Sequence, residues 1–154
     1  MHTNWYSRLV VSKGSDHGVE LGDCVIDQYG NLVGVVVSLG GNHCTISTLI
    51  DAGLELGGLV ARTGDAAILE GEFTLMGEGR LKLSSLPQGS ELIAGDQVLT
   101  SGLGGVYPSG LVAGYVEEVR SEASGAGRYA VIVPQTELDA LKQVFIIKSF
   151  DVVE

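Results

Sequence analysis

The residues best suited to chemistry are a serine beside a glycine-rich run and two histidines. Ser101 precedes Gly102, and His43 lies eight residues before Asp51. A serine nucleophile needs a general base that is itself oriented by an acid, together with donors for an oxyanion. Ser101, His43 and Asp51, with His17 as the other available base, are therefore the candidate residues of a serine hydrolase.

The surroundings of Ser101 argue against that hydrolase. The Gly-Asp-Ser-Gly-Gly loop of chymotrypsin-like proteases is absent, because Asp96 is followed by Gln97 and no acid precedes Ser101. His17 and His43 both lie in glycine-containing turns, where a solvated imidazole is the ordinary case. We therefore expect Ser101 to form part of a turn and predict no catalytic residue.

Cofactor and metal sites have no better support. The glycines of residues 102–105 are not followed by a lysine or by the start of a helix, which a phosphate-binding loop requires. Cys24 and Cys44 are 20 residues apart, with no CxxC pair and no histidine at ligand spacing. We predict neither a cofactor nor a metal, and the two cysteines are either buried as small apolar residues or joined in a disulfide.

Composition restricts the class of partner. Of 154 residues, 9 are basic and 19 acidic, giving a net charge of −10. Nucleic acids and anionic membranes are recognised through clusters of basic side chains, so neither is an expected partner. The sequence holds no apolar run long enough to cross a bilayer, so any membrane attachment would need an anchor outside it.

Short β-branched runs separated by Gly, Asp, Asn and Ser predict an all-β protein. The 23 glycines suit tight turns, and no segment keeps a helical apolar period over three turns. The expected strands are residues 8–12, 23–27, 32–39, 44–49, 56–62, 66–70, 80–84, 97–100, 111–120, 129–133 and 143–150. At most one short helical turn is expected, at residues 136–141, where Thr136 could cap it.

An internal similarity divides the chain in two. Residues 19–26 resemble residues 94–99 at an offset of 73, and residues 32–36 resemble residues 112–116 at an offset of 80. We therefore predict two small six-stranded β-barrels, residues 1–66 and 67–154, with a junction within residues 63–73. Closure would remove the exposed sheet edges. The last strand could stay in the second barrel or return to the first.

Residues 100–110, here called the glycine loop, have a demanding backbone between two strands. The loop is either a rigid connection with Tyr107 packed over a barrel mouth, or a surface that faces a partner. Tyr107, Pro108 and Tyr115 are the candidate interface residues. The loop residues that we single out are Thr100, Ser101, Gly102, Leu103, Gly104, Gly105, Tyr107, Pro108 and Gly110.

Four blocks in order resemble the extracytoplasmic part of the rod shape-determining MreC family. Asn4-Trp5-Tyr6 leads into residues 10–19, which are similar to the family's first strand and its K-G-[ST]-x-x-G-V turn. Residues 27–36 resemble the family's next hairpin. Residues 100–111 match its most distinctive motif, T-S-G-L-G-G-[IV]-[FY]-P-x-G, and residues 138–147 resemble its terminal segment.

The resemblance implies a chymotrypsin-like barrel pair without the catalytic triad, preceded by a coiled coil and one transmembrane helix. It implies a non-enzymatic scaffold of the cell-elongation machinery outside the cytoplasmic membrane. The implied partners are the protein itself, as a dimer or filament, a class B penicillin-binding protein, MreD, MreB and RodZ. The family has no catalytic residue to transfer, and serine hydrolysis remains the alternative.

Overall fold

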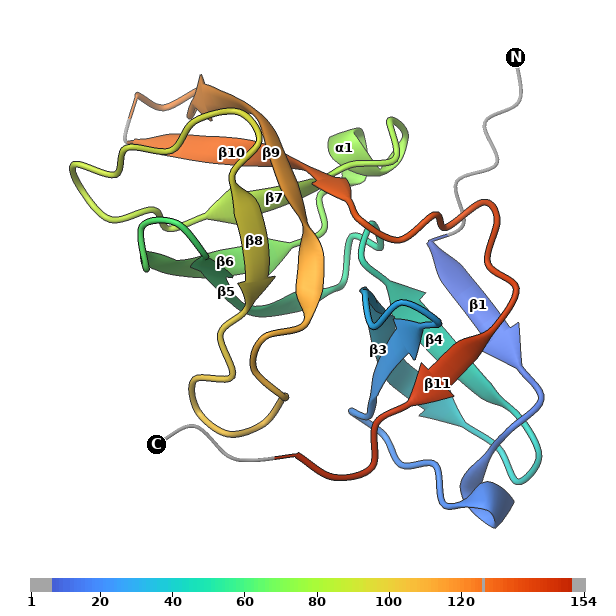
Figure 1. The fold of residues 1–154 in the computed structure, drawn as a ribbon. Coiled ribbons are helices and arrows are strands. Elements are labelled where there is room, and N and C mark those ends of the chain that lie inside the picture. Colours follow the sequence, from blue (N-terminus) through green and yellow to red (C-terminus); the bar gives the residue numbers. More distant parts are fainter. Residues whose placement is uncertain (1–6, 126, 151–154) are drawn as a thin grey trace.

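The computed structural model describes residues 7–125 and 127–150 and confirms the all-β prediction. Figure 1 shows two groups of strands, joined by the segment that follows β10. Asn4-Trp5-Tyr6, the start of the first resemblance block, lies outside the described residues. Nearly every predicted strand forms within one or two residues of its expected bounds, because alternating and β-branched runs suit a half-buried pleated surface.

The described elements are eleven strands, one four-residue α-helix and one three-residue 3-10 helix. In chain order they are β1 (Arg8–Val11), η1 (Ser15–His17), β2 (Cys24–Asp27), β3 (Leu32–Leu39), β4 (Cys44–Thr48), β5 (Glu55–Val60), β6 (Ala66–Glu70), α1 (Phe73–Met76), β7 (Leu81–Ser84), β8 (Gln97–Thr100), β9 (Val112–Ser121), β10 (Arg128–Pro134) and β11 (Val144–Ile146). The last strand is shorter than predicted.

The strands form one closed barrel and one open sheet. The barrel has six strands in the order β10-β7-β6-β5-β8-β9, the expected number, and it includes β5 from within residues 1–66. The first unit differs from the expected six-stranded barrel, because its described residues form a five-stranded sheet in the order β1-β4-β3-β2-β11. All strand pairs in both sheets are antiparallel.

The chain passes from the first sheet into the barrel before it reaches the predicted junction. Both β5 and β6 belong to the barrel and pair with each other across residues 61–65, so the predicted junction at residues 63–73 falls within the barrel. The sheets change between β4 and β5, and β11 returns to the first sheet beside β2. The division into residues 1–66 and 67–154 as independently folding domains stays a prediction.

The sequence repeat is a structural repeat in register. In the first sheet, residues 24–26 pair with residues 32–35. In the barrel, residues 97–99 pair with residues 112–115, and these strands are offset from the first pair by 73 and 80 residues, as the sequence blocks are. The register shifts at the same step in both pairs, and β3–β4 and β9–β10 also share a second shift. Each shift marks a β-bulge, which adds a residue to one strand and changes which side chains share a face.

Beside each first bulge, two backbones lie too close for a side chain. A Cβ on Gly34 would lie 2.1 Å from the carbonyl oxygen of Ser47, and one on Gly114 would lie 2.0 Å from that of Val133. Both distances are far below van der Waals contact and involve backbone, which cannot rotate away. Glycine is therefore required at both positions, and these two residues occupy equivalent places in the repeat.

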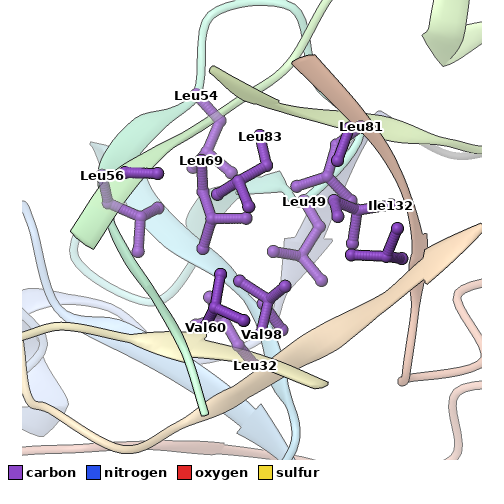
Figure 2. Close-up of a cluster of buried hydrophobic side chains, with 14 of the residues drawn as sticks. Leu32, Leu49, Leu54, Leu56, Val60, Leu69, Leu81, Leu83, Val98 and Ile132 are labelled. Carbon is purple, nitrogen blue, oxygen red and sulfur yellow. The ribbon is translucent and has the colours of Figure 1, made fainter. Parts of the chain in front are cut away.

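The bulge lets β3 serve two hydrophobic clusters. Leu32 and Val35 belong to the cluster that fills the barrel, whereas Val33 and Val36 belong to a second cluster inside the first sheet. Figure 2 shows Leu32 from β3 and Leu49 from the turn after β4 among the side chains of the barrel cluster. Both are fully buried, and burial of such a side chain contributes about 1.5–3 kcal/mol.

The helix expected at residues 136–141 does not form, and this prediction is wrong. The Thr136 hydroxyl donates to Asp27 Oδ2 at 2.7 Å instead of capping a helix. Leu138 is buried in the cluster of the first sheet. Tertiary contacts therefore override the local helical preference, and the only described α-helix is α1, where Leu75 is buried.

Asp27 is a buried carboxylate that ties two distant segments together. In addition to the Thr136 hydroxyl, its carboxylate accepts the backbone N–H groups of Tyr29 at 2.8 Å and Asn31 at 3.0 Å. It also accepts the side-chain amide of Asn31 at 3.2 Å. Burial acts to raise the pKa of Asp27, but these hydrogen bonds outweigh it and hold that pKa below its ordinary value. The charged carboxylate therefore stabilises the β2–β3 turn against the segment after β10.

We predict that Gly34→Ala destabilises the protein by about 1–3 kcal/mol, as over-packing against a fixed backbone does. Urea unfolding followed by circular dichroism measures the change. Gly53→Ala is the matched control, because a Cβ there would meet only an Asp51 carboxylate oxygen at 3.7 Å. Equal stability of the two variants would show that β3 and β4 are not held this close.

Candidate docking site around the glycine loop

Thr100 closes the glycine loop at its base. Its buried hydroxyl donates to the carbonyl oxygen of Pro108 at 2.8 Å and accepts the N–H of Leu111 at 2.9 Å. The backbone adds bonds from Thr100 N–H to Leu111 and from Gly110 N–H to Thr100. One side chain thus fixes both ends of a loop that has little regular structure of its own.

The loop glycines are required by conformation. Gly102, Gly104, Gly105 and Gly110 all have positive φ, between 67° and 88°, in the left-handed region that side chains disfavour. A Cβ on Gly102 would also lie 2.6 Å from the Cβ of Ser109. The motif therefore specifies a backbone shape, and whether the loop serves only as a connection or also faces a partner stays a prediction.

The three candidate interface residues have different environments. Tyr107 is half-buried against the barrel cluster, and its pKa is raised first by burial and then by neighbouring Cys24. Pro108 is buried, so the expectation that it is an exposed interface residue is wrong. Tyr115 is 41% exposed on the outer face of β9. Tyr107 thus packs across from the barrel to the first sheet, and Tyr115 faces outward.

The residues of the hydrolase alternative each have another partner. Ser101 is buried and its hydroxyl accepts the N–H of Leu103 at 3.2 Å. His43 Nδ1 lies 3.0 Å from the Asn42 side-chain oxygen. His17 Nδ1 accepts the N–H of Gly14 at 3.1 Å.

Asp51 is likewise engaged elsewhere. It accepts the Ser47 hydroxyl at 2.5 Å and Arg8 Nε at 3.3 Å. No bond within the described residues links the serine, a histidine and this acid, so the structure does not assemble a triad from them.

The two cysteines are free and buried, on opposite faces of the first sheet. Cys24 faces the barrel cluster, and burial followed by the nearby Asp23 raises the pKa of its thiol to about 12. Cys44 faces the sheet's own cluster, and burial raises its pKa as well. Both side chains therefore act as small apolar residues, and the disulfide alternative is not realised.

A groove forms where the glycine loop meets the first sheet, and we call it the loop groove. Three segments that are distant in sequence build it: the turn before β2, the loop itself and the segment after β11, which Figure 1 shows beside the loop. Its lining residues are Glu20, Leu21, Gly22, Asp23, Cys24, Val106, Pro108, Ile147, Lys148 and Phe150.

The loop groove exposes apolar side chains beside paired charges. Val106 is 67% exposed and Leu21 63%, and Phe150 also reaches the surface. Lys148 Nζ donates to Asp23 at 2.7 Å and to Glu20 at 3.0 Å, and these bonds raise the pKa of Lys148. Exposed large apolar side chains gathered with charged ones at a rim are typical of protein interfaces.

Sequence reasoning identified the loop but missed most of the groove. Leu21 and Phe150 lie far from the glycine loop in sequence, and only the fold brings them into one groove with Val106. No helix in the described part of the chain is long and apolar enough to cross a bilayer. Within the same residues, no three His, Cys, Asp or Glu side chains are grouped to hold a metal ion.

The fold and the site define a class of all-β proteins: two sheets are built on one repeated strand unit, and a glycine loop between two barrel strands borders a groove with exposed apolar side chains. The family model "Rod shape-determining protein MreC, barrel core" matches residues 1–148. The chain belongs to the MreC family.

Individual relatives agree with this assignment. The cell shape-determining protein MreC of Listeria monocytogenes is 27% identical over 154 residues, which cover 95% of this chain and 50% of that protein. The crystal structure of MreC from Pseudomonas aeruginosa superposes with a TM-score of 0.82 at 26% identity, covering 94% of this chain and 90% of that one. The chain spans about half the length of the curated relatives it matches.

A further solved structure has a bound partner. It is a complex between penicillin-binding protein PBP2 and MreC from Helicobacter pylori, with a TM-score of 0.66 at 20% identity, covering 83% of this chain and 79% of that one. At this identity the likeness shows the fold alone.

We predict that Thr100→Val destabilises the protein by about 1–3 kcal/mol, because valine keeps the volume but leaves the buried Pro108 carbonyl and Leu111 N–H without their partner. Hydrogen exchange should also show faster exchange of the Leu111 amide. Ser109→Ala, at an exposed position of the same loop, is the control and should change stability by under about 0.5 kcal/mol. Unchanged exchange at Leu111 in Thr100→Val would contradict this role.

Proposed function

We propose that this chain is a non-enzymatic docking part of a cell-shape scaffold and binds a peptidoglycan synthase of the class B penicillin-binding type. Its membership of the MreC family, whose curated relatives are cell shape-determining proteins, supports the role. The complex of PBP2 with MreC from Helicobacter pylori supports the class of partner.

The loop groove is the surface that we assign to this docking. The observation that carries the assignment is the exposure of Val106 and Leu21 on backbone that is held rigid by Thr100 and by glycines of positive φ. Rigid apolar anchors lose little conformational entropy on binding, which is why such positions make effective contacts. Tyr115 lies outside the groove lining and belongs to the proposal only as a secondary contact.

The remaining family features are part of the same proposal, but without residues assigned to them. They are location outside the cytoplasmic membrane, attachment through a preceding transmembrane helix, self-association, and contacts with MreD, MreB and RodZ. A net charge of −10 favours partners with basic surfaces. We assign no residue of this chain to these contacts.

Val106→Glu should weaken binding to a class B penicillin-binding protein ectodomain by about tenfold or more, because it places a carboxylate in an apolar contact. Biolayer interferometry with the immobilised ectodomain measures the change, and thermal melting checks the fold. Phe73→Glu is the control, since Phe73 is 76% exposed on α1, far from the glycine loop in Figure 1. Binding that is lost in Phe73→Glu and kept in Val106→Glu would place the docking site elsewhere.

The hydrolase alternative makes a different prediction for a fluorophosphonate probe. We expect the folded protein to stay unlabelled under conditions that label a chymotrypsin-like protease, because Ser101 is buried and bonded to Leu103 rather than to a base. Intact-mass spectrometry detects the adduct, and Ser101→Ala controls for labelling elsewhere. An adduct on Ser101 would support the hydrolase and contradict the non-enzymatic scaffold.

A further inference from the structure

The first sheet has two free edges where the barrel has none. Within the described residues, β1 pairs only with β4, and β11 pairs only with β2. In the barrel, β6 pairs with both β5 and β7 and so closes the sheet. An unpaired edge presents backbone N–H and C=O groups that can accept another strand.

The open sheet matches the barrel strand for strand, except for β6. Around the repeated unit, β1 pairs with β4 as β7 pairs with β10, and β11 pairs with β2 as β5 pairs with β8. The order β1-β4-β3-β2-β11 therefore corresponds to β7-β10-β9-β8-β5. The gap between β1 and β11, here called the strand gap, stands where β6 lies in the barrel.

The backbone of β11 faces the strand gap in the way an acceptor edge requires. The Ile147 N–H donates to the Cys24 carbonyl oxygen at 2.9 Å, on the side of β2. Because backbone groups alternate in direction along an antiparallel strand, those of Val144 and Ile146 face away from β2. Two residues of β11 are thus positioned to pair with an added strand.

The walls of the strand gap are apolar, and the lysines that line it are Lys13 and Lys148, of which Lys148 is already bonded to Asp23 and Glu20. Val11, Val144 and Ile146 are half-buried against the cluster of the first sheet, and Phe145 is 49% exposed. A groove in this region is lined by Val11, Lys13, His17, Val19, Val144, Phe145, Ile146 and Lys148. None of these is acidic, although the chain carries 19 acids against 9 bases.

The barrel shows what kind of strand such a gap holds. In β6 the side chains of Ala67 and Leu69 are buried, whereas Ile68 and Glu70 are only half-buried. A strand in the equivalent place needs the same alternation, and Lys13 in the lining favours a carboxylate on it. We propose that the strand gap accepts an extended acidic segment of a partner protein as a sixth strand, antiparallel to β1 and β11.

The test uses a fluorescein-labelled peptide with the sequence of residues 64–72, Gly-Asp-Ala-Ala-Ile-Leu-Glu-Gly-Glu, as the probe. Fluorescence anisotropy with the whole chain should show saturable binding. Val144→Pro should weaken it about tenfold or more, because it removes an N–H that faces the gap, and proline is tolerated at the first residue of a strand. Val144→Ala keeps that N–H and is the matched control, expected to stay within about threefold of the native chain.

Hydrogen exchange gives a second readout that does not depend on a variant. The amides of Val144 and Ile146 should exchange freely in the chain alone and become protected by the peptide. A peptide with lysines in place of its acids should bind more weakly, whereas Val106→Glu in the loop groove should leave peptide binding unchanged. This last comparison separates a failure here from a failure of the loop-groove proposal.

Several results would overturn the proposal. The first is the absence of saturable binding up to about 1 mM peptide, since a dissociation constant of that size is a binding free energy of only about −4 kcal/mol. The second is equal binding of the peptide by Val144→Pro and Val144→Ala. Protection of the Val144 and Ile146 amides in the chain alone would show that its own residues fill the gap. Protection that rises with protein concentration would assign the gap to a second copy instead of a partner.

Discussion

Burial of β3 on both faces is the constraint on which the structure depends. Leu32 and Val35 pack toward the barrel, whereas Val33 and Val36 pack into the first sheet. A regular strand alternates faces at every residue, so this division needs the bulge, and Gly34 beside the bulge lets β3 approach the backbone of β4 closely. Separating the sheets would expose Leu32 and Leu49, and the hydrophobic effect opposes this at about 1.5–3 kcal/mol per side chain.

The glycine loop takes its position from that shared cluster. Tyr107 reaches from the loop to Cys24 on the barrel-facing side of the first sheet, and Thr100 fixes the two ends of the loop. Asp27 and Thr136 form a second connection, between the β2–β3 turn and the segment that leads to β11. The loop groove is therefore assembled from parts whose relative positions are set by buried contacts, and its apolar side chains need little reordering to bind.

The sequence predicts local structure better than the assignment of strands to sheets. Residues 32–39, 66–70 and 97–100 form strands at the predicted bounds, because their side-chain patterns suit a pleated surface wherever it lies. The same patterns do not say that β6 closes the barrel and has no counterpart in the first sheet. That distinction comes from long-range pairing, as does the failure of the helix at residues 136–141, where Thr136 bonds to Asp27.

The features of the candidate site also divide into those that local sequence predicts and those that depend on long-range contacts. The loop glycines could be predicted because positive φ is a local property that selects glycine. The burial of Pro108 and the grouping of Leu21 with Val106 could not, because both depend on contacts between segments that are distant in sequence.

The repeat also explains why equivalent positions have different uses. By their places in the repeated unit, Tyr115 on β9 corresponds to Val35 on β3. Val35 is buried in the barrel cluster, whereas Tyr115 is 41% exposed. One strand unit, used once with its outer face covered and once with it exposed, thus forms an internal joint in the first sheet and an accessible surface in the barrel. Such a division favours binding, because one copy of the unit joins the two sheets and the other copy is left to present its surface to a partner.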